Sequence, residues 1–143
     1  MEYREFVKRV QETAELASAA EAVIATEAVL GTLGELLSPT QRRHLAAQLR
    51  KPLKDYVDRW VERPPREKTR PHRFSLEQFY TRVAARSGVR YPAAVRHSQA
   101  VMTALREAVA AGELADLFRE LPQEYEELLS GIPTSPASPS LIE

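Results

Sequence analysis

Hydrophobic residues recur along the chain with helical spacing, and the pattern of the first half returns in the second. Near the N-terminus, the residues that fill one stripe of a predicted helix are Tyr3, Phe6, Val7 and Val10. The same spacing returns in the second half at Leu76, Phe79, Tyr80 and Val83. The two halves are therefore predicted to begin with equivalent amphipathic helices.

Two further stretches of the first half match stretches of the second half. Both matches have the same offset, which pairs Val29 with Val101. Residues 29–37 correspond in this way to residues 101–109, and residues 53–60 correspond to residues 125–132. The hydrophobic positions largely agree within these stretches, while the polar positions between them mostly differ. An internal duplication of this kind predicts one helical unit built twice.

Capping residues and prolines predict the helix boundaries of the first half. Ser18 with Glu21 is typical of a capping box, and we expect it to open a long helix that reaches about residue 37. Proline has no N–H to leave unpaired at the first helical position, so Pro39 and Pro52 predict the starts of a third and a fourth helix. The fourth helix is expected to include Trp60.

The second half restarts with similar signals. Ser75 with Gln78 predicts another capping box, and Phe74 is expected to pack on Phe79 as a hydrophobic staple. Because these contacts fix how the chain approaches the helix, the start of the second half is sharply defined.

Glycines divide the remainder of the second half. Gly88 is predicted to close its first helix, and a long helix should follow from Tyr91 to about residue 110. Gly112 is expected to break the long helix, and two short helices are predicted at residues 113–120 and 123–131.

We therefore expect an all-α fold, a helical bundle of two pseudo-equivalent repeats with three to four helices each. No run of strand length alternates between apolar and polar residues. The repeats are assigned to residues 1–61 and 74–131. Residues 62–73 are predicted to form a basic, proline-rich linker, and residues 132–143 a flexible proline- and serine-rich tail.

Three pairs of segments resemble a known family: residues 3–10 with 75–83, 28–37 with 100–109, and 47–49 with 120–122. With this tandem layout the chain resembles the bacterial family called domain of unknown function 2267, over about residues 2–130. The resemblance implies a small helical protein. It implies no catalytic residues, because the family has no settled activity.

The amino-acid composition excludes several kinds of functional site. The chain has no cysteine, which excludes disulfides, iron–sulfur clusters and thiolate zinc sites. It has no apolar run near the roughly 20 residues that a membrane-spanning helix needs. The first residues lack the basic start and apolar stretch of a secretory signal, so we expect a cytoplasmic protein without membrane contact.

The sequence contains few candidate catalytic residues. His44, His72 and His97 lack the glutamate spacing of di-iron bundles and the motif of zinc proteases. No glycine-rich phosphate loop is present, and Gly31 and Gly34 are expected to allow close helix contact instead. We therefore predict no enzyme activity, no metal and no cofactor.

Two charged positions recur in both halves. Arg9 matches Arg82, and Glu35 matches Glu107. These residues could form a duplicated site. The alternative, which we favour, is that each arginine pairs with the glutamate of its own half and braces the first helix on the second.

Corresponding surfaces of the two halves carry opposite charge. Residues 42–73 contain 11 basic and 4 acidic residues, whereas residues 113–127 contain 6 acidic and 1 basic residue. Such faces could attract each other within a chain, join two molecules head to tail, or stay independently solvated. The basic strip could also bind nucleic acid or another anion. The candidate interaction residues on these faces are Arg42, Arg43, Arg50, Lys51, Lys54, Glu113, Asp116, Glu120 and Glu126.

The predicted tail offers another contact. Prolines recur there every third residue, and Leu141 and Ile142 add a small apolar pair near the end of the sequence. A terminal stretch of this composition is also typical of a disordered end. We predict a non-catalytic helical module that binds a protein partner or itself, with anion or nucleic-acid binding through residues 42–73 as the alternative.

Overall fold

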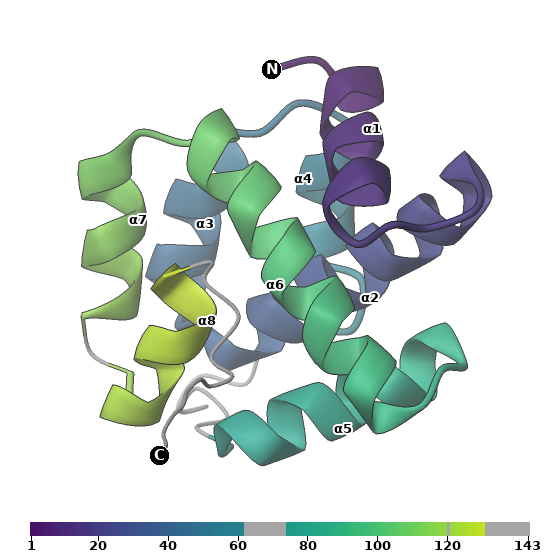
Figure 1. Cartoon of the computed structure of the whole chain (residues 1–143). Helices are drawn as coiled ribbons and strands as arrows, with labels where there is room; N and C mark the ends of the chain where they lie inside the picture. The colour runs from purple at the N-terminus through teal and green to yellow at the C-terminus, as the bar shows by residue number, and fades with distance from the viewer. Residues whose placement is uncertain (62–73, 120, 131–143) are drawn as a thin grey trace.

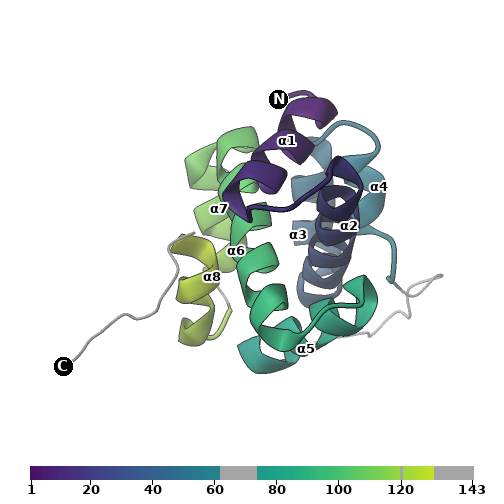
Figure 2. The same cartoon turned by 45° about the vertical axis from the view of Figure 1, so that its right-hand side comes forward.

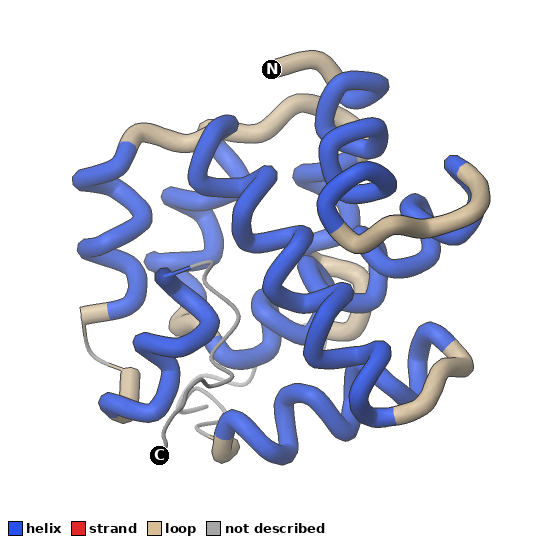
Figure 3. The backbone as a smooth tube through the Cα atoms, viewed as in Figure 1, coloured by secondary structure: helices blue, strands red, loops and turns tan. Residues whose placement is uncertain are grey.

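The computed structural model describes residues 1–61, 74–119 and 121–130. Within these ranges the chain forms eight α-helices, one short 3-10 helix and no strand (Figure 3). The helices of residues 1–61 are α1 (Tyr3–Thr13), α2 (Ala19–Leu36), α3 (Pro39–Ala47) and α4 (Leu53–Val57). Those of the remainder are α5 (Leu76–Ser87), α6 (Tyr91–Ala108), α7 (Ala111–Phe118), η1 (Gln123–Tyr125) and α8 (Glu126–Ser130). The prediction of an all-α fold is confirmed.

Helices from the two ends of the sequence interleave. The two 18-residue helices, α2 and α6, pack against each other at the centre. Helix α1 packs on both of them, and so does α5 at the other end of the molecule (Figure 1). Helix α4 lies along α2 and α8 lies along α6, as the turned view in Figure 2 also shows. Helix α3 contacts α7. One continuous hydrophobic core results, and residues of all three described ranges contribute to it.

Helix α2 is buried on nearly every side because α1, α4, α5 and α6 surround it. Its two glycines, Gly31 and Gly34, allow the segment of residues 57–60 to lie directly against it. A Cβ on Gly34 would overlap the backbone carbonyl of Val57, and a Cβ on Gly31 would overlap the ring of Trp60. The prediction that these glycines allow close contact is confirmed.

Local signals placed most helix ends correctly. The capping box of Ser75 and Gln78 is present, with both backbone N–H groups bonded to side-chain oxygens. The rings of Phe74 and Phe79 lie 6.4 Å apart between centroids, as the hydrophobic staple requires. Gly88 closes α5 in the left-handed conformation, at φ 71°.

Three details differ from the predictions. Ser18 caps α2, but the Glu21 carboxylate accepts from the Ser18 hydroxyl instead of completing a capping box on the backbone. Trp60 lies beyond α4, which ends at Val57. Gly112 lies inside α7, because the break comes earlier, where Val109 turns to an extended conformation.

The predicted linker, residues 62–73, and the predicted tail, residues 132–143, lie outside the described residues. Within the ranges that are described, no helix is long and apolar enough to cross a membrane.

Candidate interaction surfaces

The recurring arginines and glutamates form ion pairs, but with partners exchanged between the halves. Arg9 Nε on α1 lies 3.0 Å from Glu107 Oε1 on α6, and Arg82 Nη1 on α5 lies 3.5 Å from Glu35 Oε1 on α2. The prediction that each arginine pairs within its own half was wrong. Helices α1 and α5 each pack on both α2 and α6, but Arg9 lies on the side of α1 that faces α6, and Arg82 lies on the side of α5 that faces α2.

The Glu35 pair belongs to a larger, more buried network. Arg86 Nη1 lies 2.5 Å from Glu35 Oε1 and donates to the hydroxyl of Thr32 at 2.9 Å. The Arg86 guanidinium also covers the ring of Trp60, 4.2 Å from its centroid. These contacts tie α5 and the segment after α4 to α2.

The predicted basic surface is partly neutralised by contacts within the molecule. Arg42 lies 3.5 Å from the Asp58 carboxylate and donates to the backbone carbonyls of α2's C-terminal end. Arg50 pairs with Glu2 at 3.0 Å. Arg43 is exposed and donates to a hydroxyl on its own helix, Lys51 is exposed and Lys54 is half-buried.

The predicted acidic surface faces α3 at one edge. Gln48 donates to Glu113 Oε1 at 2.9 Å, and Gln41 donates to the backbone carbonyl of Leu117. Asp116 pairs at 2.5 Å with Arg119, which directly follows the last residue of α7. Polar side chains thus join the two oppositely charged surfaces where α3 meets α7, while Glu120, Leu141 and Ile142 lie outside the described residues.

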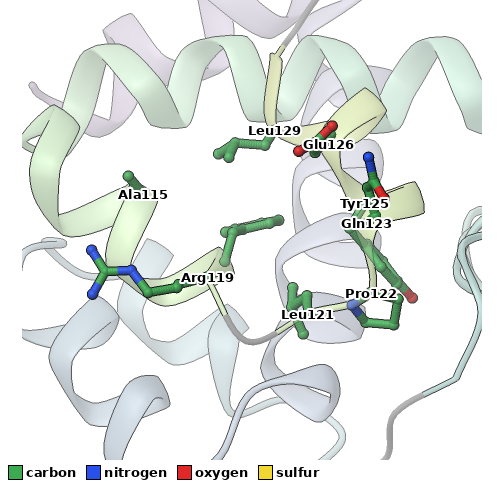
Figure 4. A pocket seen from close by; sticks show the side chains of 9 residues that line it. Ala115, Arg119, Leu121, Pro122, Gln123, Tyr125, Glu126 and Leu129 are labelled. Carbon is green, nitrogen blue, oxygen red and sulfur yellow. The ribbon is translucent and has the colours of Figure 1, made fainter.

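A groove separates α7 from α8, and we call it the α7–α8 groove. It consists of two adjoining hollows of about 480 and 300 Å³, and both are lined by Ala115 and Leu129. In Figure 4, Ala115 and Arg119 lie on one wall, and Leu129 and Glu126 lie on the other. Further lining residues are Thr103, Arg106, Glu107, Ala111, Leu114, Phe118, Leu121, Pro122, Gln123, Tyr125 and Ser130.

A second groove, the α1–α2 groove, lies between the first two helices of the chain. It has a volume of about 600 Å³ and is mainly apolar. Its lining residues are Tyr3, Arg4, Val7, Lys8, Gln11, Ala19 and Val23. Tyr3 is anchored by a hydroxyl contact of 3.0 Å with Tyr56, and burial together with this contact raises the pKa of Tyr56 to about 12.

The histidines differ in environment. His44 is exposed on α3, whereas His97 is buried on α6. Burial, and next the neighbouring Arg96, lower the pKa of His97 below its ordinary 6.5, while Glu21 acts in the opposite direction. His97 Nδ1 and Ser98 Oγ are buried without a hydrogen-bond partner among the described residues. Among those residues, no cluster of three or more His, Asp or Glu side chains could hold a metal.

The protein family described as "Uncharacterized conserved protein (DUF2267)" matches residues 3–128. The chain belongs to the DUF2267 family. The resemblance inferred from the paired segments is thereby confirmed. No curated protein shows significant similarity to the chain.

In this DUF2267 protein, neither groove was predicted from the sequence. Each depends on the size of side chains at single positions, such as Ala19 on α2 and Ala115 on α7, together with the spacing of two helices. The substitutions between the two halves carried a signal, because the constant offset pairs Ala19 with Tyr91 and Ala115 with Arg43.

Proposed function

We propose that this DUF2267 protein is a non-catalytic, cytoplasmic module that binds another protein through the α7–α8 groove. The proposal includes the internal duplication: residues 1–61 and 74–130 form two pseudo-equivalent repeats of one helical unit. The carrying observation is that this groove is open in one half, while contacts of Arg42 and Gly34 bridge the corresponding place in the other half.

Reciprocal packing supports the equivalence of the halves. Helix α1 packs on α6 in the same way that α5 packs on α2, and α2 pairs with α6, as α3 does with α7. The ion pairs are reciprocal as well, since Arg9 and Arg82 each reach the glutamate of the other half. The constant offset between the halves therefore assigns each lining residue of the groove to a counterpart in the first half.

In the first half, contacts of Arg42 and Gly34 join α2, α3 and the segment that contains α4. Arg42 bonds to the carbonyls of Gly34 and Leu37, as well as to the Asp58 carboxylate. The absence of a side chain at Gly34 allows α4 to approach α2 until its backbone is in contact.

In the second half, the corresponding residues leave the α7–α8 groove open. Leu114 stands at the position of Arg42 and cannot form its polar contacts. Arg106 stands at the position of Gly34, and its side chain extends to the backbone carbonyl of Ser130 at the end of α8. A side chain at this position prevents α8 from approaching α6 as closely as α4 approaches α2.

The lining of the groove indicates the chemistry of a partner. Its lining mixes polar and apolar side chains, and the apolar ones, such as Leu129, provide the surface that a hydrophobic anchor would cover. Exposed carboxylates lie on the elements that form its walls: Glu113 on α7, Glu124 in η1 and Glu126 on α8, of which Glu126 itself lines the groove. We propose that the partner is a segment with apolar anchors and flanking basic residues. A second copy, presenting its basic surface around Arg43, would supply the basic residues of such a partner.

The test compares three forms of the full chain as bait in native cell extract. Ala115 is exposed and lines both hollows, so Ala115→Arg fills the groove without altering the core. Ala85 is exposed on α5, and Ala85→Arg adds the same side chain elsewhere. We expect a protein that wild type and Ala85→Arg retain and Ala115→Arg loses. Equal retention by all three forms would contradict the proposal, and retention of nucleic acid alone would favour the basic strip at residues 42–73.

A further inference from the structure

The α1–α2 groove is open at a place that two tyrosines fill in the second half. Val7 corresponds to Tyr80 when the first helices of the two halves are matched, and Ala19 corresponds to Tyr91 at the constant offset. The rings of Tyr80 and Tyr91 meet edge to face, 5.8 Å apart between centroids. This comparison rests on the proposed equivalence of the halves, but it concerns a different surface from the α7–α8 groove.

Of the tyrosine pair, Tyr80 is firmly held in the second half, whereas Tyr91 is 41% exposed. Tyr80 is only 3% exposed, and its hydroxyl donates to Glu127 at 2.8 Å. Burial, and next this bond to Glu127, raise the pKa of the Tyr80 hydroxyl above its ordinary value. The helix pair α5 and α6 thus uses aromatic rings to cover the seam that α1 and α2 leave open.

The rim of the α1–α2 groove also differs from its counterpart. Arg4 and Lys8 line the groove and form no ion pair within the described ranges. Their counterparts in the second half are Glu77 and Thr81. Ile24, which follows the lining residue Val23, is 48% exposed where the second half has a charged residue. The first half therefore combines an apolar hollow with unpaired positive charge.

We propose that the α1–α2 groove binds a protein segment in which an aromatic side chain is flanked by carboxylates. The aromatic ring of the segment lies against Val7 and Ala19, at the place in the first half that corresponds to the place of Tyr91 in the second. The carboxylates pair with Arg4 and Lys8, which lie on successive turns of α1 and so face the same way. Opposite charge at the rim selects acidic segments over basic ones.

The test is a chemical-shift titration of the isotope-labelled full chain with the peptide acetyl-Glu-Tyr-Glu-amide. Two control peptides replace the tyrosine with serine, or both glutamates with lysine. The variant Ala19→Tyr supplies the ring that the second half already has, and Ala85→Tyr is its matched control at an exposed position of α5. The double variant Arg4→Glu/Lys8→Glu removes the positive rim at exposed positions and leaves the core intact.

We expect the peptide to shift amide resonances of residues 3–23, and both control peptides to bind about tenfold more weakly or worse. Ala19→Tyr and the double variant should each weaken binding by about tenfold, with Ala85→Tyr unchanged. The inference would be overturned if no amide resonance of residues 3–23 shifted. It would also be overturned if Ala19→Tyr and the double variant bound the peptide as tightly as wild type does. Ala115→Arg should bind this peptide normally, so failure of the α7–α8 proposal would show separately.

Discussion

Arg86 Nη1 on α5 lies 2.5 Å from Glu35 Oε1 on α2, and both side chains are largely buried. The pair is the inner part of the contact between α5 and α2. At the other end of the molecule, the corresponding contact of α1 with α6 relies on Arg9 and Glu107, whose side chains are 47% and 39% exposed. The ion pairs of these two helix contacts therefore differ in their exposure to solvent.

Arg86→Ala should lower the free energy of unfolding by about 2 kcal/mol, because it leaves the Glu35 carboxylate partly buried with a weaker partner and uncovers Trp60. Arg9→Ala should cost less than about 1 kcal/mol, because water screens the exposed pair. Urea unfolding of both variants measures the difference. Equal losses would mean that burial of the Glu35 pair does not matter.

Gly34→Ala should destabilise the fold by about 3 kcal/mol, because its Cβ would overlap the backbone carbonyl of Val57, which cannot rotate away. Gly112→Ala is the matched control, since no atom lies within 4 Å of its Cβ position and it stands inside α7. The control should gain about 0.5–1 kcal/mol through better helix propensity. Thermal unfolding compares the two, and a stable Gly34→Ala would contradict the close approach of α4.

Stability should depend on pH through His97. Its folded-state pKa lies below the ordinary 6.5, so the unfolded state binds more protons between the two values. The contribution of His97 is therefore complete above pH 6.5 and is lost as pH falls toward the folded pKa. When the pH is lowered from about 8 to about 5, the free energy of unfolding should fall less for His97→Gln than for wild type. Parallel curves for the two proteins would show that His97 titrates normally.

Local sequence signals predicted the helices well because caps act over a single helical turn. Ser75 and Gln78 satisfy each other's backbone N–H groups, and no distant residue takes part. Trp60 was misplaced for a tertiary reason: its ring lies over Gly31 and beneath Arg86, and these contacts replace further turns of α4.

The pairing of the recurring charges could not be predicted in the same way. Periodicity places Arg9 on an exposed part of its helix, but it does not say whether α2 or α6 lies beside that part. The two grooves pose a similar problem. The replacement of Arg42 by Leu114 is visible in the sequence, whereas the space it leaves depends on the distance between α6 and α8.

The central claim is that the α7–α8 groove binds a protein partner, and an affinity measurement tests it most directly. The protein recovered by wild type would be titrated calorimetrically into wild type, Ala115→Arg and Ala85→Arg, with each fold verified by circular dichroism. We predict that Ala115→Arg weakens binding by at least about tenfold, roughly 1.4 kcal/mol, and that Ala85→Arg leaves it unchanged. Unchanged affinity for folded Ala115→Arg would contradict the claim.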